Sequence, residues 1–204
     1  MTQVPLHLAS ASPRRRLLLE EAGFTPDVIS SGIDDAELRP KAVPPVHWAA
    51  SLAYLKARGG LRFTKAGIVL GADTIVDKAG DIIGQPRDAD HARNTILQLS
   101  GGSHSVISGV ALLWRDEKGT VQRSIFADTS TVHVGALPSD AIEAYIDSGD
   151  WRGKAGGYNL SERIEAGWPI TFDGDPATVM GLPMQRLIPM LEILRCARQE
   201  TSAS

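Results

Sequence analysis

Cysteine is nearly missing from this sequence of 204 residues, in which Cys196 is the only one. No disulfide framework can form, and the helical apolar pattern around Cys196 predicts a core position rather than a nucleophile. Apolar runs of membrane-spanning length are missing too. Residues 1–12 lack the charged start and the long apolar stretch of a signal peptide. We therefore expect a cytoplasmic protein without membrane contact.

An excess of positive charge is lacking as well. The formal net charge is −3, and hydrophobic and charged residues make up 43% and 22% of the chain. This balance is ordinary for a globular protein and gives no basis for a broad basic face, so we expect no nucleic-acid partner. We expect one domain over residues 1–204, with a disordered tail from about residue 199.

Several well-known reactive arrangements are absent. The sequence has no Walker A motif, no GxGxxG after an apolar run and no GxSxG. Its 5 histidines are scattered without metal-ligand spacing, so a zinc enzyme or a serine–histidine hydrolase is not expected. The remaining reactive side chains are carboxylates, arginine and lysine. This set suits metal-assisted phosphoryl or nucleotidyl chemistry.

Positive charge is concentrated near the start of the chain. Residues 6–8 can form a strand, and Ser12 followed by Pro13 predicts the start of a helix with Ser12 as its N-cap. Arginines then occupy residues 14–16, although a helix N-terminus favours acidic side chains. A bound polyanion would make these arginines favourable. The alternative is a solvated arginine cluster without a ligand.

Two further charged residues stand in apolar surroundings. Residues 68–70 form an apolar run that predicts a buried strand, which ends in the GADT of residues 71–74. Acidic residues are seldom buried alone, so Asp73 needs a partner, a metal or a catalytic role, with a capping or turn role equally open. Lys56 lies at the edge of the apolar seam of a helix that is predicted from Val46 onward, where a lysine can simply reach out to water.

The rest of the chain mixes strands and helices. Hairpin-like succession near the middle argues against a purely parallel sheet, so we expect an α/β or α+β fold with a mixed sheet. A glycine-rich loop is expected over residues 151–167. Further strands are predicted at 25–31, 81–84, 106–114 and 124–134, and further helices after Asp88, after Ser139 and near the C-terminus.

Five motifs run in order along the chain. They are LASASPRR at 8–15, GADTIV at 71–76, LSGGSHSVISGVAL at 99–112, GKAGGY at 153–158 and VMGLP at 179–183. Together they resemble the Maf family of nucleoside triphosphate pyrophosphatases. The resemblance implies a mixed, curved β-sheet flanked by helices, with two lobes around a central cleft. It also implies hydrolysis of a nucleoside triphosphate to the monophosphate and pyrophosphate, with Mg²⁺ or Mn²⁺ and often as a homodimer.

The same resemblance implies roles for single residues. Asp73 corresponds to a general base or metal-holding carboxylate, and Asp35 stands where an acidic residue would share the metal. The implied substrate-binding residues are Ser10, Arg14, Arg15, Lys56 and Thr74.

Two further substrate-binding positions depart from the family pattern. The usual GKP reads GQP at residues 84–86, so neutral Gln85 replaces a phosphate-binding lysine. This loss would weaken binding by about 1–3 kcal/mol unless Arg87 or Arg16 compensates. Ser161 stands where the family has a glutamine that contacts the base. The base preference therefore stays open between dTTP or UTP and modified nucleotides.

Three functions are compatible with this sequence. Asp73 and Lys56 favour an enzyme that releases pyrophosphate. Hydrolysis at the outer phosphates would release orthophosphate instead. Gln85 and Ser161 favour a catalytically weak nucleotide-binding regulator of cell division.

Overall fold

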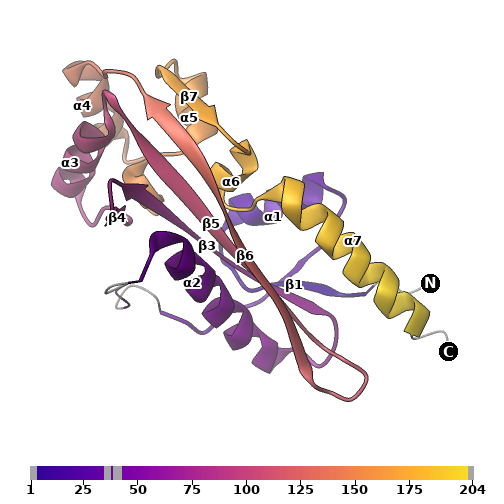
Figure 1. Ribbon diagram of the computed structural model, residues 1–204. Helices are drawn as coiled ribbons and strands as arrows, with labels where there is room; N and C mark the ends of the chain where they lie inside the picture. The colour runs from indigo at the N-terminus through magenta and orange to yellow at the C-terminus, as the bar shows by residue number, and fades with distance from the viewer. Residues whose placement is uncertain (1–3, 35–37, 39–42, 202–204) are drawn as a thin grey trace.

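Seven strands form one mixed sheet within the residues that the computed structural model describes, which are 4–34, 38 and 43–201 (Figure 1). The strands are β1 (Leu6–Leu8), β2 (Asp27–Val28), β3 (Ile68–Lys78), β4 (Asp81–Ile83), β5 (Gly102–Arg115), β6 (Val121–Val134) and β7 (Ile170–Asp173). The helices are α1 (Pro13–Glu21), α2 (Pro45–Gly60), α3 (Ala89–Leu99), α4 (Ser139–Ser148), α5 (Leu160–Glu165), α6 (Pro176–Met180) and α7 (Met184–Thr201). Two short 3-10 helices are η1 (Leu61–Phe63) and η2 (Ala155–Gly157).

The sheet combines parallel and antiparallel pairing, as the sequence predicts. Its strand order is β2-β1-β3-β5-β6-β7, with β4 pairing with β3 off this path. β1 runs parallel to β2 and β3, whereas the other pairs are antiparallel. The long strands β3, β5 and β6 form its middle, so the fold rests on three strands with extensive mutual pairing.

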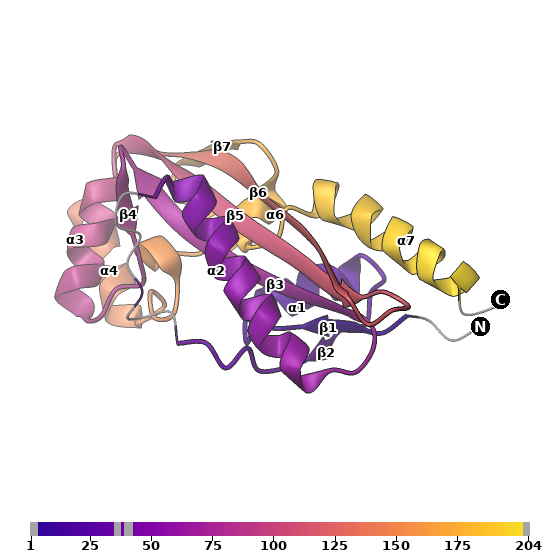
Figure 2. The ribbon, with the colours of Figure 1, turned by 60° about the horizontal axis from the view of Figure 1, so that its bottom comes forward.

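Helices cover both faces of this sheet, with α2 along one face and α1 and α7 against the other (Figure 2). α3, α4 and α5 gather around a second core toward the end of the sheet away from α7 (Figure 1). The two largest of the four clusters of buried residues, one against α1 and α7 and the other against α3, α4 and α5, divide the molecule into two lobes, as the family resemblance implies. No helix in the described part of the chain is long and apolar enough to span a membrane.

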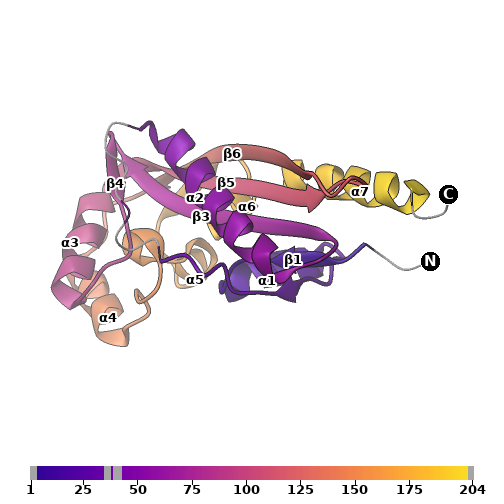
Figure 3. The same ribbon diagram turned by 90° about the horizontal axis from the view of Figure 1, so that it is seen from below.

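One edge of β3 is paired only at its two ends. β1 pairs with residues 68–70 and β4 with residues 76–78, so residues 71–75 have no strand partner on this edge within the described chain. Figure 3 shows β1 and β4 toward opposite ends of β3. Five residues of extended chain span about 17 Å. The gap leaves room for a ligand beside the middle of the sheet.

Helix α2 approaches β3 and β5 unusually closely. A Cβ atom at Gly71 would lie 2.3 Å from the carbonyl oxygen of Ala53, and one at Gly109 would lie 2.2 Å from that of Ala49. Both distances are too short for any side chain, so only glycine allows this approach. The contact fixes which residues of α2 face the gap beside β3.

Three predicted elements differ in extent from the structure. The strand expected to end in residues 71–74 continues without a break as the 11-residue β3, because β5 pairs with it along most of its length. The strand expected at 25–31 is reduced to the two residues of β2, which pair only with β1. The loop expected at 151–167 contains η2 and α5, whose N-cap Asn159 accepts a hydrogen bond from the amide of Glu162.

The C-terminal helix corrects two further predictions. α7 extends to Thr201, so the tail expected to be disordered from about residue 199 begins as helix. Cys196 is exposed rather than in the core. Leu187 and Leu191 carry the buried stripe of α7, and Cys196 falls off this stripe because five residues after Leu191 correspond to a rotation of about 140° beyond one full turn.

Replacing Gly109 with alanine tests the close contact of α2. We expect Gly109→Ala to lower the free energy of unfolding by at least about 1–3 kcal/mol, because the new methyl group meets backbone that cannot move aside. Gly84→Ala is the matched control, since a Cβ there has nothing within 4 Å. Urea denaturation measures both variants, and equal stabilities would contradict the proposed packing constraint.

Candidate active site

A cavity of about 880 Å³ lies at the gap beside β3. Its lining comes from both lobes and includes the start of α1, α2, β3, β4, the chain between β4 and α3, and residues from 153–160 and 179–181. Arg14, Arg15, Lys56, Asp73 and Thr74 all contribute to its wall. The fold therefore gathers residues from distant parts of the sequence around one space that is large enough for a nucleotide.

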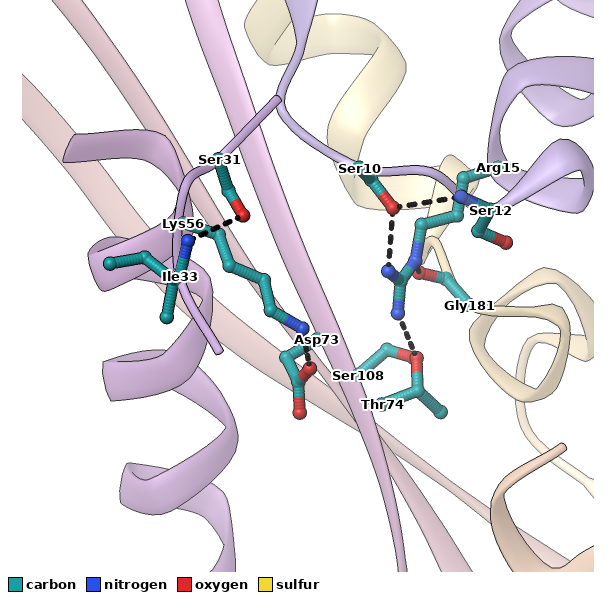
Figure 4. A network of polar contacts seen from close by, with 10 residues as sticks. All are labelled: Ser10, Ser12, Arg15, Ser31, Ile33, Lys56, Asp73, Thr74, Ser108 and Gly181. Atoms are coloured by element: carbon teal, nitrogen blue, oxygen red, sulfur yellow. Dashed lines mark hydrogen bonds and ion pairs between the residues drawn. The ribbon is translucent and has the colours of Figure 1, made fainter. Parts of the chain in front are cut away.

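An ion pair between α2 and β3 lies in this wall. Lys56 Nζ is 2.5 Å from Asp73 Oδ1, and the two side chains are 15% and 10% exposed (Figure 4). Asp73 lies inside β3, so it is neither a helix cap nor a turn residue. Lys56 does not simply extend into water. The carboxylate thus has the partner that the sequence requires, and the close approach of α2 to β3 explains how the lysine reaches it.

Arg15 joins four segments of the chain. Its Nη1 donates to Ser10 Oγ, its Nη2 to Thr74 Oγ1 and its Nε to the carbonyl oxygen of Gly181, each at 3.0 Å (Figure 4). The side chain is buried. Three bonds from one planar guanidinium fix its orientation, which a lysine could not reproduce. Ser10 is therefore placed to hold Arg15 rather than in the cavity lining itself.

Ser108 extends this network and was not anticipated from the sequence. Its hydroxyl is 2.8 Å from that of Thr74 and donates to the carbonyl oxygen of Thr178 at 2.7 Å. Ser108 is fully buried on β5. The only signal in the sequence is a small polar residue within the apolar run of this strand. Its partners come from β3 and α6, so the sequence could not identify them.

The arginine cluster at residues 14–16 divides into different environments. Arg14 is half-buried and lines the cavity, next to the buried Arg15. Arg16 is exposed, does not line the cavity and pairs with Glu20, with Nε and Oε1 2.6 Å apart. Ser12 occupies the N-cap position as predicted, but its side chain forms no capping hydrogen bond.

The remaining predicted site residues differ in placement. Gln85 lines the cavity. Ser161 does not, although its neighbour Leu160 does; its hydroxyl donates to the sulfur of Met180, a lining residue, at 3.5 Å. Asp35 lies outside the described residues.

A protein-only metal centre is not present in the described part of the chain, where no three His, Cys, Asp or Glu side chains form a group that could hold an ion. Mg²⁺ commonly uses one or two carboxylates and takes its other ligands from substrate phosphates and water. Asp73 in the cavity wall fits a cation that is shared with a phosphate ligand in this way.

Tyr158 lines the cavity and contacts a buried histidine. Its hydroxyl is 2.7 Å from His104 Nε2, and the other ring nitrogen of His104 has no partner in the described structure. Burial lowers the pKa of His104 to about 4, with smaller contributions from the charges of Lys78 and His133. Burial likewise raises the pKa of Tyr158. Both groups are therefore uncharged near neutral pH.

Comparison with known proteins gives consistent matches over most of the chain. The family described as Maf-like protein matches residues 5–194. A dTTP/UTP pyrophosphatase of Ruminiclostridium cellulolyticum is 38% identical over 187 residues, which cover 92% of this chain and 94% of that protein. A dTTP/UTP pyrophosphatase of Lawsonia intracellularis is 31% identical over 194 residues, covering 92% and 83%. The solved structure of a nucleoside-triphosphatase / dITP/XTP pyrophosphatase from Mycobacterium abscessus has a TM-score of 0.38 and 17% identity, covering 66% and 76%.

The low pKa of His104 predicts a loss of stability in acid. The unfolded chain binds a proton near pH 6.5 and the folded protein only near pH 4, so the free energy of unfolding falls as the pH drops between these values. Urea denaturation measures the free energy of unfolding at pH 7 and at pH 4.5. Between these two pH values it should fall by about 2–3 kcal/mol less in His104→Gln than in the wild type. The control His47→Gln changes an exposed histidine and should follow the wild type. Identical pH dependence in all three proteins would contradict this explanation.

Proposed function

Because the chain belongs to the Maf-like protein family, we propose that it is a nucleoside triphosphate pyrophosphatase, which hydrolyses a nucleoside or deoxynucleoside triphosphate to the monophosphate and pyrophosphate. The relatives named dTTP/UTP pyrophosphatases support this reaction. The observation that carries the proposal is the Lys56–Asp73 pair, which lies in the wall of a nucleotide-sized cavity beside two arginines.

The residues in the cavity wall suit separate tasks in this reaction. Arg14 and Arg15 bind phosphate oxygens, for which guanidinium groups are well suited. Lys56 holds the Asp73 carboxylate in a fixed orientation. Asp73 positions a water molecule for attack on the α-phosphorus and accepts its proton. The bond from this phosphorus to the bridging oxygen breaks, and pyrophosphate leaves.

A divalent cation, Mg²⁺ or Mn²⁺, is part of the proposal. Asp73 would hold it together with the phosphates, and Asp35 remains the proposed second carboxylate. When bound, such a cation neutralises phosphate charge and lowers the pKa of bound water. The family resemblance is the basis for proposing a homodimer, which analytical ultracentrifugation tests. A cytoplasmic location stays the expectation from the sequence.

dTTP and UTP are the proposed first substrates, because the matched relatives are named for them. Ser161 lies outside the cavity lining, so it does not take over direct contact with the base. The base is then held by other residues of the wall. This position gives the regulator interpretation no independent support. The buried Lys56–Asp73 pair in the cavity wall supports the enzyme interpretation.

Product analysis distinguishes the three functions considered. Incubation of dTTP, UTP and a panel of modified nucleotides with Mg²⁺ or Mn²⁺ should yield monophosphate and pyrophosphate from at least one member. Chromatography of the nucleotide together with phosphate detection, with and without an added pyrophosphate-hydrolysing enzyme, measures both products. Release of orthophosphate without that enzyme would point to attack on the outer phosphates. Nucleotide binding without turnover would favour the regulator.

Asp73→Asn tests the catalytic role at residue level. We expect kcat to fall at least about 100-fold while nucleotide binding stays largely intact, because the amide cannot accept the proton of the attacking water. Asp77→Asn is the matched control on the same strand. Asp77 does not line the cavity, and an amide oxygen can still accept its hydrogen bond from the Gly80 amide. Turnover like that of the wild type in Asp73→Asn would refute the assignment.

A further inference from the structure

The cationic side chains of the cavity differ in whether the protein itself binds them. Four line it, namely Arg14, Arg15, Lys56 and Arg87. Lys56 is paired with the Asp73 carboxylate, and Arg15 donates three hydrogen bonds within the protein. The guanidinium groups of Arg14 and Arg87 have no hydrogen bond or ion pair in the described part of the chain. Within the described chain, Arg14 and Arg87 are therefore the cations of this cavity whose guanidinium donors are fully open to a ligand.

The path of the chain brings Arg87 to the opposite flank of the gap from Arg14. β4 runs antiparallel to β3, with Ile83 opposite Val76, so the chain after β4 turns back toward the level of Asp73. The carbonyl oxygen of Gly84 accepts a hydrogen bond from the amide of Gly156 at 3.1 Å, which ties this segment to the glycine-rich residues beyond α4. Arg14, in contrast, enters from the β1 side at the start of α1.

His91 supplies a second donor beside Arg87. Its Nδ1 accepts a hydrogen bond from the backbone amide of Arg87 at 3.3 Å. The neutral ring must then carry its proton on Nε2, which can donate to an anion. The backbone amide of His91 donates to the side chain of Asp88, the N-cap of α3, at 2.7 Å. This bond holds the first turn of α3, from which the His91 ring extends. His91 also lines the cavity.

We propose that Arg87 and His91 form a pyrophosphate subsite, which holds the two outer phosphates of the substrate and then the pyrophosphate product. This inference rests on the proposed function. The outer phosphates need cationic partners with open donors most, since a terminal phosphate carries roughly −1.5 to −2 charges near neutral pH. Arg87 thereby supplies the cation that neutral Gln85 lacks. Arg16 cannot do so, because it lies outside the cavity and pairs with Glu20.

Calorimetric titration of pyrophosphate in the presence of Mg²⁺ tests this subsite without turnover. We expect Arg87→Gln to bind pyrophosphate at least about tenfold more weakly than the wild type, the loss expected for one charge-assisted hydrogen bond. Arg16→Gln is the matched control and should bind like the wild type. Titration with dTMP, which lacks the outer phosphates, should give the same affinity in all three proteins.

Two further variants separate a lost charge from a disturbed fold. Arg87→Lys keeps the cation and should recover most of the pyrophosphate affinity. Adding Gln85→Lys to Arg87→Gln should also restore binding, because it returns a cation to the same segment. His91→Phe should weaken pyrophosphate binding without changing dTMP binding. Failure of both lysine substitutions to restore binding would overturn the charge-based assignment.

Failure of the subsite and failure of the enzyme function give different results. Wild-type pyrophosphate affinity in Arg87→Gln, equal losses for pyrophosphate and dTMP, or no pyrophosphate binding by the wild type would each overturn the subsite. None of these results affects whether pyrophosphate appears among the products of the wild-type protein. Conversely, selective loss of pyrophosphate binding in Arg87→Gln supports the subsite even if no nucleotide is hydrolysed.

Discussion

The close contact between α2 and the central strands is the constraint on which the site depends. Glycines at positions 71 and 109 let the helix backbone approach β3 and β5 to distances that no side chain would permit. At this separation Lys56 reaches Asp73 directly, and both side chains are largely removed from water. A buried pair of opposite charges is favourable only when its geometry is good. The helix–sheet distance therefore controls the electrostatics of the cavity.

Around this ion pair, several polar side chains are already hydrogen-bonded to other groups of the protein. Arg15 links Ser10, Thr74 and the α6 end, and buried Ser108 holds Thr74 from the neighbouring strand. Side chains fixed in this way lose little entropy when a substrate binds. Arg14 and Arg87, whose guanidinium groups form no hydrogen bond or ion pair within the described chain, line the cavity from the α1 side and from the segment after β4. A rigid centre between cationic flanks is suited to a ligand that carries several negative charges.

Predictions from sequence succeeded where local chemistry decides. The strand at β1, the helix after Ser12 and the apolar core of β3 follow from residue type and spacing, and the structure contains all three. The lengths of the strands and helices were less predictable. The strand end expected at residues 71–74 is absent because β5 pairs along β3. Cys196 is exposed because its helix buries only one stripe against the sheet, and the position of that stripe depends on tertiary contact.

The sequence by itself determined the family and the mixed fold and predicted most of the candidate site, since the order of the motifs and the charged residues within apolar runs can be recognised without coordinates. Tertiary structure alone decided which of these residues meet. Arg15 and Arg16 are adjacent in sequence, yet a turn of about 100° per residue sends one into the core and the other into water. Lys56 and Asp73 meet across 17 positions, and Arg87 lines the same cavity because β4 runs back along β3. Long-range pairing of this kind depends on packing, which no local pattern encodes.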